Sequence, residues 1–128
     1  MSDKPTNFFA HIELNTQDPA AAKTFYSALF PDWQWQDMPT GGGHDYTVIK
    51  TSQGAGGGLM KHPMPGAPSF WCSYVQVADV KAAYNQALSL GGKSVKEPTD
   101  VGVGWIALFI DPTGAVLGLW QPAPHSAA

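Results

Sequence analysis

Hydrophobic and polar positions form two similar blocks along the chain, each an alternating stretch followed by a helical period. The stretches "HIELNT" and "CSYVQV" alternate between apolar and polar side chains, which predicts strands with one face against a core. In "DPAAAKTFYSAL" and "DVKAAYNQALSL" the apolar positions recur every three or four residues, which predicts a helix after each strand. Asp18 and Asp79 are expected N-caps, because an aspartate carboxylate accepts hydrogen bonds from the free N–H groups of a first turn. Pro31 and Gly91 are expected to end the helices.

Each helix is expected to bury one apolar stripe against its strands. The stripes consist of Ala22, Phe25 and Leu29 in the first helix, and of Val80, Ala83, Ala87 and Leu90 in the second.

The two blocks are copies of one structural unit. A shift of 61 residues places Asp18 on Asp79 and Leu29 on Leu90. Three candidate strands separated by Gly, Pro and Ser follow each helix: "DWQWQDMP", "HDYTVIKT" and "GGGLMKHP", then "KSVKEPT", "GWIALFI" and "AVLGLWQP". The chain therefore reads as βαβββ twice within a single domain, which is an α+β fold. We place module one at 8–61, a proline-rich linker at 62–69 and module two at 70–122.

Composition excludes several classes of partner. The net charge is −3 without a basic cluster, which argues against nucleic acid and anionic membranes. A single cysteine cannot form an internal disulfide, which suits a reducing compartment. The sequence shows no signal peptide, and no apolar run approaches the ~20 residues of a membrane span. We expect a cytoplasmic protein.

The doubled βαβββ pattern, together with "GGGLM" and "DPTGAVLGLWQ", resembles the glyoxalase, bleomycin-resistance and extradiol-dioxygenase (vicinal oxygen chelate) superfamily. The resemblance covers residues ~8–122 and points to a glyoxalase-related branch. It implies that the two modules form a cup-shaped mixed sheet with the helices on its outer face. This fold carries many activities, so the resemblance alone does not name one.

The resemblance also implies where metal ligands would lie. Metal-dependent members take them from the first and fourth strands of both modules, commonly His or Gln and then Glu. The matching positions here are His11 and Cys72 in the first strands, and Gly58 and Gly118 in the fourth. Glycine has no side chain to donate, whereas a catalytic metal normally keeps three protein ligands. We therefore expect no metal and no cofactor. Other histidines, His44, His62 and His125, lie in turn-like or terminal segments.

The cup itself is expected to bind a small organic molecule. Alternation places Ile12 and Leu14 toward the helix and their neighbours on the cup face, and the two glycines leave room there for a flat ring. An apolar and aromatic surface with a few polar groups is typical of small-molecule pockets. The predicted ligand-binding residues are His11, Glu13, Asn15, Gly58, Met60, Cys72, Tyr74, Gln76, Gly118 and Trp120, with Val116 on the same face.

Two classes of function remain open. The first is a metal-independent binding protein that holds an apolar or aromatic ligand in the cup. The second is a glyoxalase-type lyase, isomerase or dioxygenase that uses a non-standard metal set, or Glu13 as base and His11 as acid. The same pair also fits a plain hydrogen-bonded pair, and Cys72 fits an inert core residue.

A homodimer is the expected assembly. A strand-rich sheet of this size leaves edges that a two-fold partner would cover. Tryptophan is enriched in interfaces. Trp33, Trp35, Trp71 and Trp105 are accordingly expected in the core or in a dimer contact rather than against a ligand.

Overall fold

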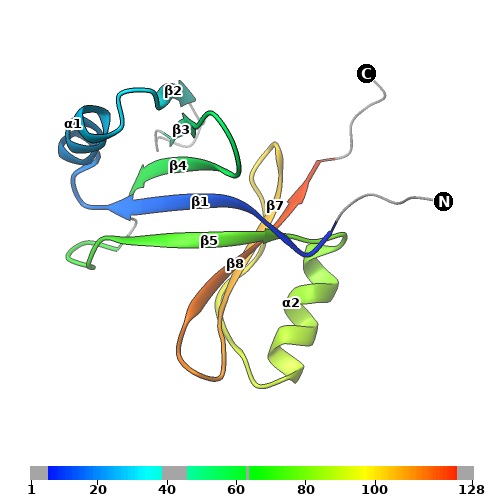
Figure 1. The fold of residues 1–128 in the computed structure, drawn as a ribbon. Helices are drawn as coiled ribbons and strands as arrows, with labels where there is room; N and C mark the ends of the chain where they lie inside the picture. Colours follow the sequence, from blue (N-terminus) through cyan, green and yellow to red (C-terminus); the bar gives the residue numbers. More distant parts are fainter. Residues whose placement is uncertain (1–5, 39–45, 63, 124–128) are drawn as a thin grey trace. The chain divides into compact units, whose positions relative to one another are not determined.

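The computed structural model describes residues 6–38, 46–62 and 64–123, and these form two helices and eight strands (Figure 1). The first module contains β1 (Phe8–Thr16), α1 (Pro19–Leu29), β2 (Gln34–Met38), β3 (Tyr46–Lys50) and β4 (Gly56–Lys61). The second contains β5 (Phe70–Gln76), α2 (Val80–Ser89), β6 (Lys93–Asp100), β7 (Gly104–Ile110) and β8 (Val116–Pro122). This order confirms the expected α+β fold with two βαβββ modules. Neither helix is long and apolar enough to cross a bilayer.

The chain divides into two compact units. The first unit comprises residues 11–72, and the second comprises residues 1–10 and 73–128. Strands follow the order β2-β3-β4-β1 in the first unit and β5-β8-β7-β6 in the second. The first strand of each module runs parallel to the fourth, and the other pairs are antiparallel. Each unit therefore holds a mixed sheet in which the first and fourth strands are neighbours.

Both helices begin at the expected caps. Asp18 Oδ1 accepts from the Ala21 N–H at 3.0 Å, and Asp79 Oδ1 accepts from the Ala82 N–H at 3.1 Å. The caps satisfy backbone donors that the first turn leaves without partners.

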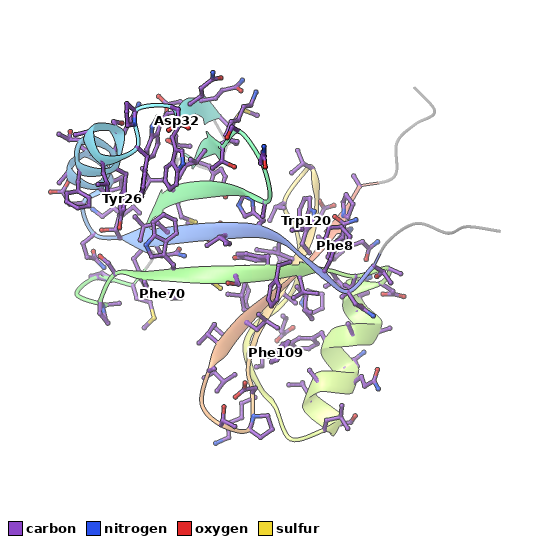
Figure 2. The ribbon with its side chains drawn as sticks, in the orientation of Figure 1. Phe8, Tyr26, Asp32, Phe70, Phe109 and Trp120 are labelled. Carbon is purple, nitrogen blue, oxygen red and sulfur yellow. The ribbon has the colours of Figure 1, made fainter. Side chains whose placement is uncertain are left out.

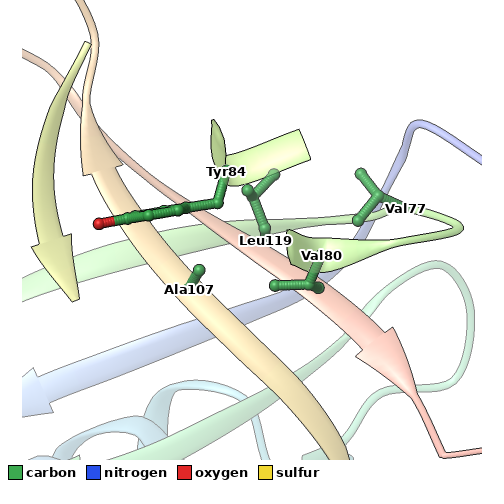
Figure 3. Close-up of a cluster of buried hydrophobic side chains, with 5 residues drawn as sticks. All are labelled: Val77, Val80, Tyr84, Ala107 and Leu119. Carbon is green, nitrogen blue, oxygen red and sulfur yellow. The ribbon is translucent and has the colours of Figure 1, made fainter. Parts of the chain in front are cut away.

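Each sheet buries one face, which we call the helix face, against its own helix. In the second unit α2 packs on β6, β7 and β8 around a cluster of five buried side chains (Figure 3). These are Val77, Val80, Tyr84, Ala107 and Leu119. In the first unit the buried cluster is Leu14, Ile49 and Leu59, with Tyr26, Trp33 and Trp35 packed against it. Trp33 and Trp35 are thus core residues, as the sequence predicted.

The expected apolar stripes are only partly buried. None of the eleven residues of α1 is buried, and Phe25 and Leu29 are 61% and 53% exposed. Tyr26, labelled in Figure 2, instead faces inward and contacts the rings of Trp33 and Trp71. In α2, Leu90 is 70% exposed because it forms the C-cap. The expectation that these three apolar residues are buried was wrong.

On the opposite side of each sheet, aromatic rings lie over glycines of a neighbouring strand. We call this side the glycine face. A Cβ on Gly58 would collide with the Tyr46 hydroxyl, and one on Gly118 would collide with the Tyr74 ring. A Cβ on Gly104 would lie 2.7 Å from Cη2 of Trp120. The flat rings that cover these glycines are therefore the protein's own.

Burial along α2 predicts two different costs of truncation. Val80→Ala removes two methyl groups from a side chain that is 0% exposed, so we expect a loss of about 2 kcal/mol in unfolding free energy. Leu90→Ala, at the exposed C-cap of the same helix, should change the unfolding free energy by less than about 0.5 kcal/mol. Urea unfolding followed by circular dichroism measures both, and equal losses would contradict the burial of this helix described above.

The Tyr74 ring over Gly118 predicts that the stability cost of Gly118→Ala depends on whether that ring is present. Gly118→Ala should cost about 1–3 kcal/mol, because the added Cβ overlaps the buried Tyr74 ring. In a Tyr74→Ala background the same substitution should cost little. Gly56→Ala is the matched control, since its Cβ would lie 3.4 Å from the Ile49 carbonyl oxygen. Urea unfolding of the four variants tests this, and an equal cost of Gly118→Ala in both backgrounds would rule out the ring contact.

Candidate functional site

The register between β1 and β4 assembles the polar residues of the first unit on its glycine face. His11 pairs with Gly56, Glu13 with Gly58, and Asn15 with Met60. Leu14 and Leu59 pair on the opposite face, where both are buried in the core. The alternation expected from the sequence is therefore present, and a ligand-binding role for this set stays a prediction.

A phenol–imidazole contact lies at the centre of this face. Tyr46 on β3 pairs with Met60, and Val48 pairs with Gly58, so the Tyr46 ring crosses Gly58 diagonally. Its hydroxyl lies 2.5 Å from Nε2 of His11. Burial lowers the pKa of His11 below its usual 6.5, so the imidazole is neutral at neutral pH. One side-chain hydrogen bond thus joins β1 to β3 across the intervening strand β4.

Glu13 and Asn15 form a second polar contact on the same face. Glu13 is 8% exposed and Asn15 is 7% exposed. Asn15 Nδ2 donates to Glu13 Oε2 at 3.2 Å. A buried carboxyl group needs such a partner, because a polar group buried without a hydrogen bond is costly.

In the second unit the predicted residues are placed by the register between β5 and β8. Tyr74 pairs with Gly118, and Gln76 pairs with Trp120. Tyr74 is only 5% exposed, with its ring over Gly118. Trp120 (Figure 2) lies across Gly104. Of the predicted residues placed here, Tyr74 and Trp120 bring aromatic rings and Gln76 brings an amide.

The residues at the four positions implied by the family do not fit a metal ion. Gly58 and Gly118 offer no donor, and the space above each contains a tyrosine ring or hydroxyl. His11 Nε2 is hydrogen-bonded to Tyr46, and the Cys72 thiol is 1% exposed. Within 6–38, 46–62 and 64–123, no three His, Cys, Asp or Glu side chains are grouped as metal ligands.

Of the other histidines, only His62 lies within the described residues. His62 Nδ1 accepts from the backbone N–H of Met64 at 3.0 Å, which is a local turn contact. His44 and His125 lie outside the described residues.

Two shallow cavities lie on the helix faces. One, of about 290 Å³, lies in the second unit beside Trp105, whose ring also lies 4.6 Å from Lys81 Nζ. The other, of about 220 Å³, lies in the first unit beside Trp33 and Trp71. Neither is lined by a residue that the sequence predicted to bind the ligand.

Tyr46 is the residue that the sequence reasoning missed. In "HDYTVIKT" the alternation puts Thr47 and Ile49 on one face, and hence Tyr46 and Val48 on the other. That signal places Tyr46 on the glycine face. The contact with His11 also needs the register of β3 against β4, which the sequence does not show.

Comparison with known sequences identifies the family. The sequence model of the Glyoxalase/Bleomycin resistance protein/Dioxygenase superfamily matches residues 8–119. A Mycobacterium tuberculosis protein named "Putative glyoxylase CFP32" is 37% identical over 114 residues, which cover 88% of this chain and 43% of that protein. The anthracycline biosynthesis protein DnrV of Streptomyces peucetius is 27% identical over 127 residues, which cover 88% and 46%. The chain thus spans less than half the length of these curated relatives.

Solved structures show the same fold at low sequence identity. Methylmalonyl-CoA epimerase from Mycobacterium tuberculosis is 16% identical, with a TM-score of 0.71 over 99% of this chain and 95% of that one. The hypothetical protein BH1468 from Bacillus halodurans is 10% identical, with a TM-score of 0.70 over 95% and 99%. At such identities the likeness establishes the fold alone. Together with the family match it confirms the resemblance read from the sequence: this chain belongs to the glyoxalase/bleomycin resistance protein/dioxygenase superfamily.

Proposed function

We propose that this protein binds a small apolar or aromatic molecule on its glycine faces, without a metal ion. The observation that carries the proposal is the contact of Tyr46 with His11 above Gly58. A phenol occupies the place from which the resemblance would have a glutamate reach a metal. The face keeps hydrogen-bonding groups and aromatic surface, which are the features that orient and hold organic ligands.

The relatives support a ligand of this kind. DnrV and DauV are both named for anthracycline biosynthesis, and an anthracycline is a fused-ring aromatic compound. Structures of methylmalonyl-CoA epimerase, which share the fold, contain an organic ligand, 2-nitronate-propionyl-CoA. Aromatic side chains such as Trp120 offer stacking surface to a flat ring.

The name of the 37% identical relative, a glyoxylase, favours an enzyme as the second candidate. Such a lyase, isomerase or dioxygenase would use a non-standard metal set or the acid–base pair Glu13 and His11. The two candidates differ in what they bind: the enzyme with a metal set is stabilised by that metal, and the binding protein by the organic ligand alone.

We also propose a homodimer, with α1 in the interface. Phe25 and Leu29 are exposed on α1, and Trp71 beside this helix is 39% exposed. Neighbouring apolar side chains on a surface commonly mark a contact with another protein. The curated relatives are more than twice as long as the segments that align with this chain. One chain of such a relative therefore has room for a second segment of this size. A second copy of this chain would supply the equivalent surface.

The binding proposal predicts stabilisation by aromatic compounds and not by metals. In differential scanning fluorimetry, 2-naphthol should raise the melting temperature of the protein. A ligand that binds only the folded state adds about 2.7 kcal/mol to the unfolding free energy at 100 times its Kd. Zn²⁺, Mn²⁺, Fe²⁺ and EDTA should leave the melting temperature unchanged. Trp120→Ala should weaken 2-naphthol binding roughly 2- to 10-fold by calorimetry, whereas Trp105→Ala, on the helix face, should not. Stabilisation by a metal, or destabilisation by EDTA, would instead support the enzyme.

The dimer proposal predicts a change of mass when α1 is made polar. Light scattering after size exclusion should give twice the chain mass for the wild type, and a monomer for Phe25→Glu/Leu29→Glu. The dimer of this variant would bury four like charges in its two-fold interface, which is unfavourable. Leu90→Glu, at the exposed leucine that forms the C-cap of α2, is the control and should remain dimeric. A monomeric wild type at about 50 μM, or a variant that stays dimeric with its circular dichroism unchanged, would refute this interface.

A further inference from the structure

The cavity on the helix face of the first unit lies over a row of residues that lacks one side chain. Gly57 on β4 pairs with Ile12 on β1 and with Ile49 on β3, so these three residues lie side by side across the sheet. Both isoleucines line the cavity, and glycine places no side chain between them. Ala55, which also lines it, contributes only a methyl group. The small residues that precede and begin β4 therefore account for a hollow of about 220 Å³.

Two tryptophans form aromatic walls of this cavity, and neighbouring rings hold both in place. Trp71 contacts the Tyr26 ring edge to face, with centroids 5.4 Å apart. Trp33 stacks on Phe30, with centroids 4.6 Å apart. Side chains that are fixed before a ligand arrives lose little conformational freedom when it binds. Trp71 remains 39% exposed, so part of its surface is open to a ligand.

The lining of the cavity determines which ligand it fits. None of the described residues around it carries a charged side chain, so a charge bound inside would have no partner. Thr51 supplies a hydroxyl, which donates to the Gln53 carbonyl oxygen at 2.8 Å. A cavity of about 150 Å³ is large enough for benzene. The volume found here therefore suits a single ring with small substituents.

The cavity of the second unit has a different chemistry, although it is larger. Asp79, Lys81 and Gln121 line it beside Trp105. The Lys81 ammonium lies over the Trp105 ring, so the aromatic surface there already has a partner. Of these two cavities, that of the first unit is the one that combines aromatic walls with an uncharged lining.

We propose that the helix-face cavity of the first unit is a further binding site, for a small neutral compound with a single aromatic ring. The ring packs against Trp33 and Trp71 above Gly57. This site is separate from the glycine faces, because none of its lining residues belongs to the set proposed to bind a ligand there.

Nuclear magnetic resonance of the full chain tests the site with p-cresol, a neutral compound of one ring. In proton–nitrogen correlation spectra, the assigned indole N–H signals of Trp33 and Trp71 should shift and saturate as p-cresol is added. The expected Kd is about 1 mM, because a ligand of so few atoms gains little binding free energy. The indole signal of Trp105 should not move.

Three variants make the test specific to the cavity. Ala55→Phe fills it with the protein's own ring and should weaken p-cresol binding more than about 10-fold at the Trp33 signal. Trp71→Leu removes one aromatic wall and should weaken binding roughly 2- to 10-fold; it decides the question if Ala55→Phe does not fold. Trp105→Leu, the same change beside the other cavity, is the matched control and should bind like the wild type.

The outcomes separate this site from the proposals above. If Trp33 and Trp71 do not shift up to about 10 mM p-cresol, or if folded Ala55→Phe or Trp71→Leu keeps full affinity, the inference is overturned. The glycine faces are judged independently by 2-naphthol. A p-cresol shift confined to Trp120 overturns the inference and supports the glycine faces instead. If the cavity signals shift only in Phe25→Glu/Leu29→Glu, a second copy covers the cavity, which overturns the inference in favour of the dimer.

Discussion

The packing of flat rings over glycines is the constraint on which the glycine faces of both units depend. Side chains on neighbouring strands project side by side, so a ring can lie across the next strand only where that strand has no Cβ. Tyr46 does this over Gly58, and Trp120 over Gly104. Each contact exists in one register only, because a slip by one residue would turn the ring toward the helix. Glycines that weaken an isolated strand are therefore specific packing positions in these sheets.

The same constraint changes the chemistry of the fourth strand. A glutamate at position 58 would project a carboxylate from β4, whereas glycine at this position admits a phenol from β3. The imidazole of His11 stands at the position that the resemblance assigns to a ligand, and its Nε2 makes a hydrogen bond with the Tyr46 hydroxyl. Because a phenol stands where a carboxylate would project, we propose that this surface suits an aromatic molecule better than a cation.

Much of the fold follows from local patterns, and these could be read from the sequence. Asp18 and Asp79 cap their helices through contacts within three residues, so the pattern alone predicts them. The face to which Leu14 points follows from alternation within one strand. The role of Tyr46 depends on how β3 is aligned with β4, which is a contact between two different strands. The sequence therefore showed which residues share a face, and not which of them touch.

The helices show a second limit of local patterns. Both carry an apolar stripe and an aspartate cap, yet α2 has the buried residues Val80 and Tyr84, whereas α1 packs on its core only through partly buried residues such as Tyr26. The periodicity of the sequence shows that one face of a helix is apolar. It does not show whether other side chains of the protein cover that face. In the first unit the rings of Trp33 and Tyr26 fill the core beside the sheet, and Phe25 remains outside. The apolar stripe on α1 is left exposed by its own unit, so only a second surface could remove it from solvent. This exposed stripe is therefore a stronger argument for assembly than the tryptophan content of the chain.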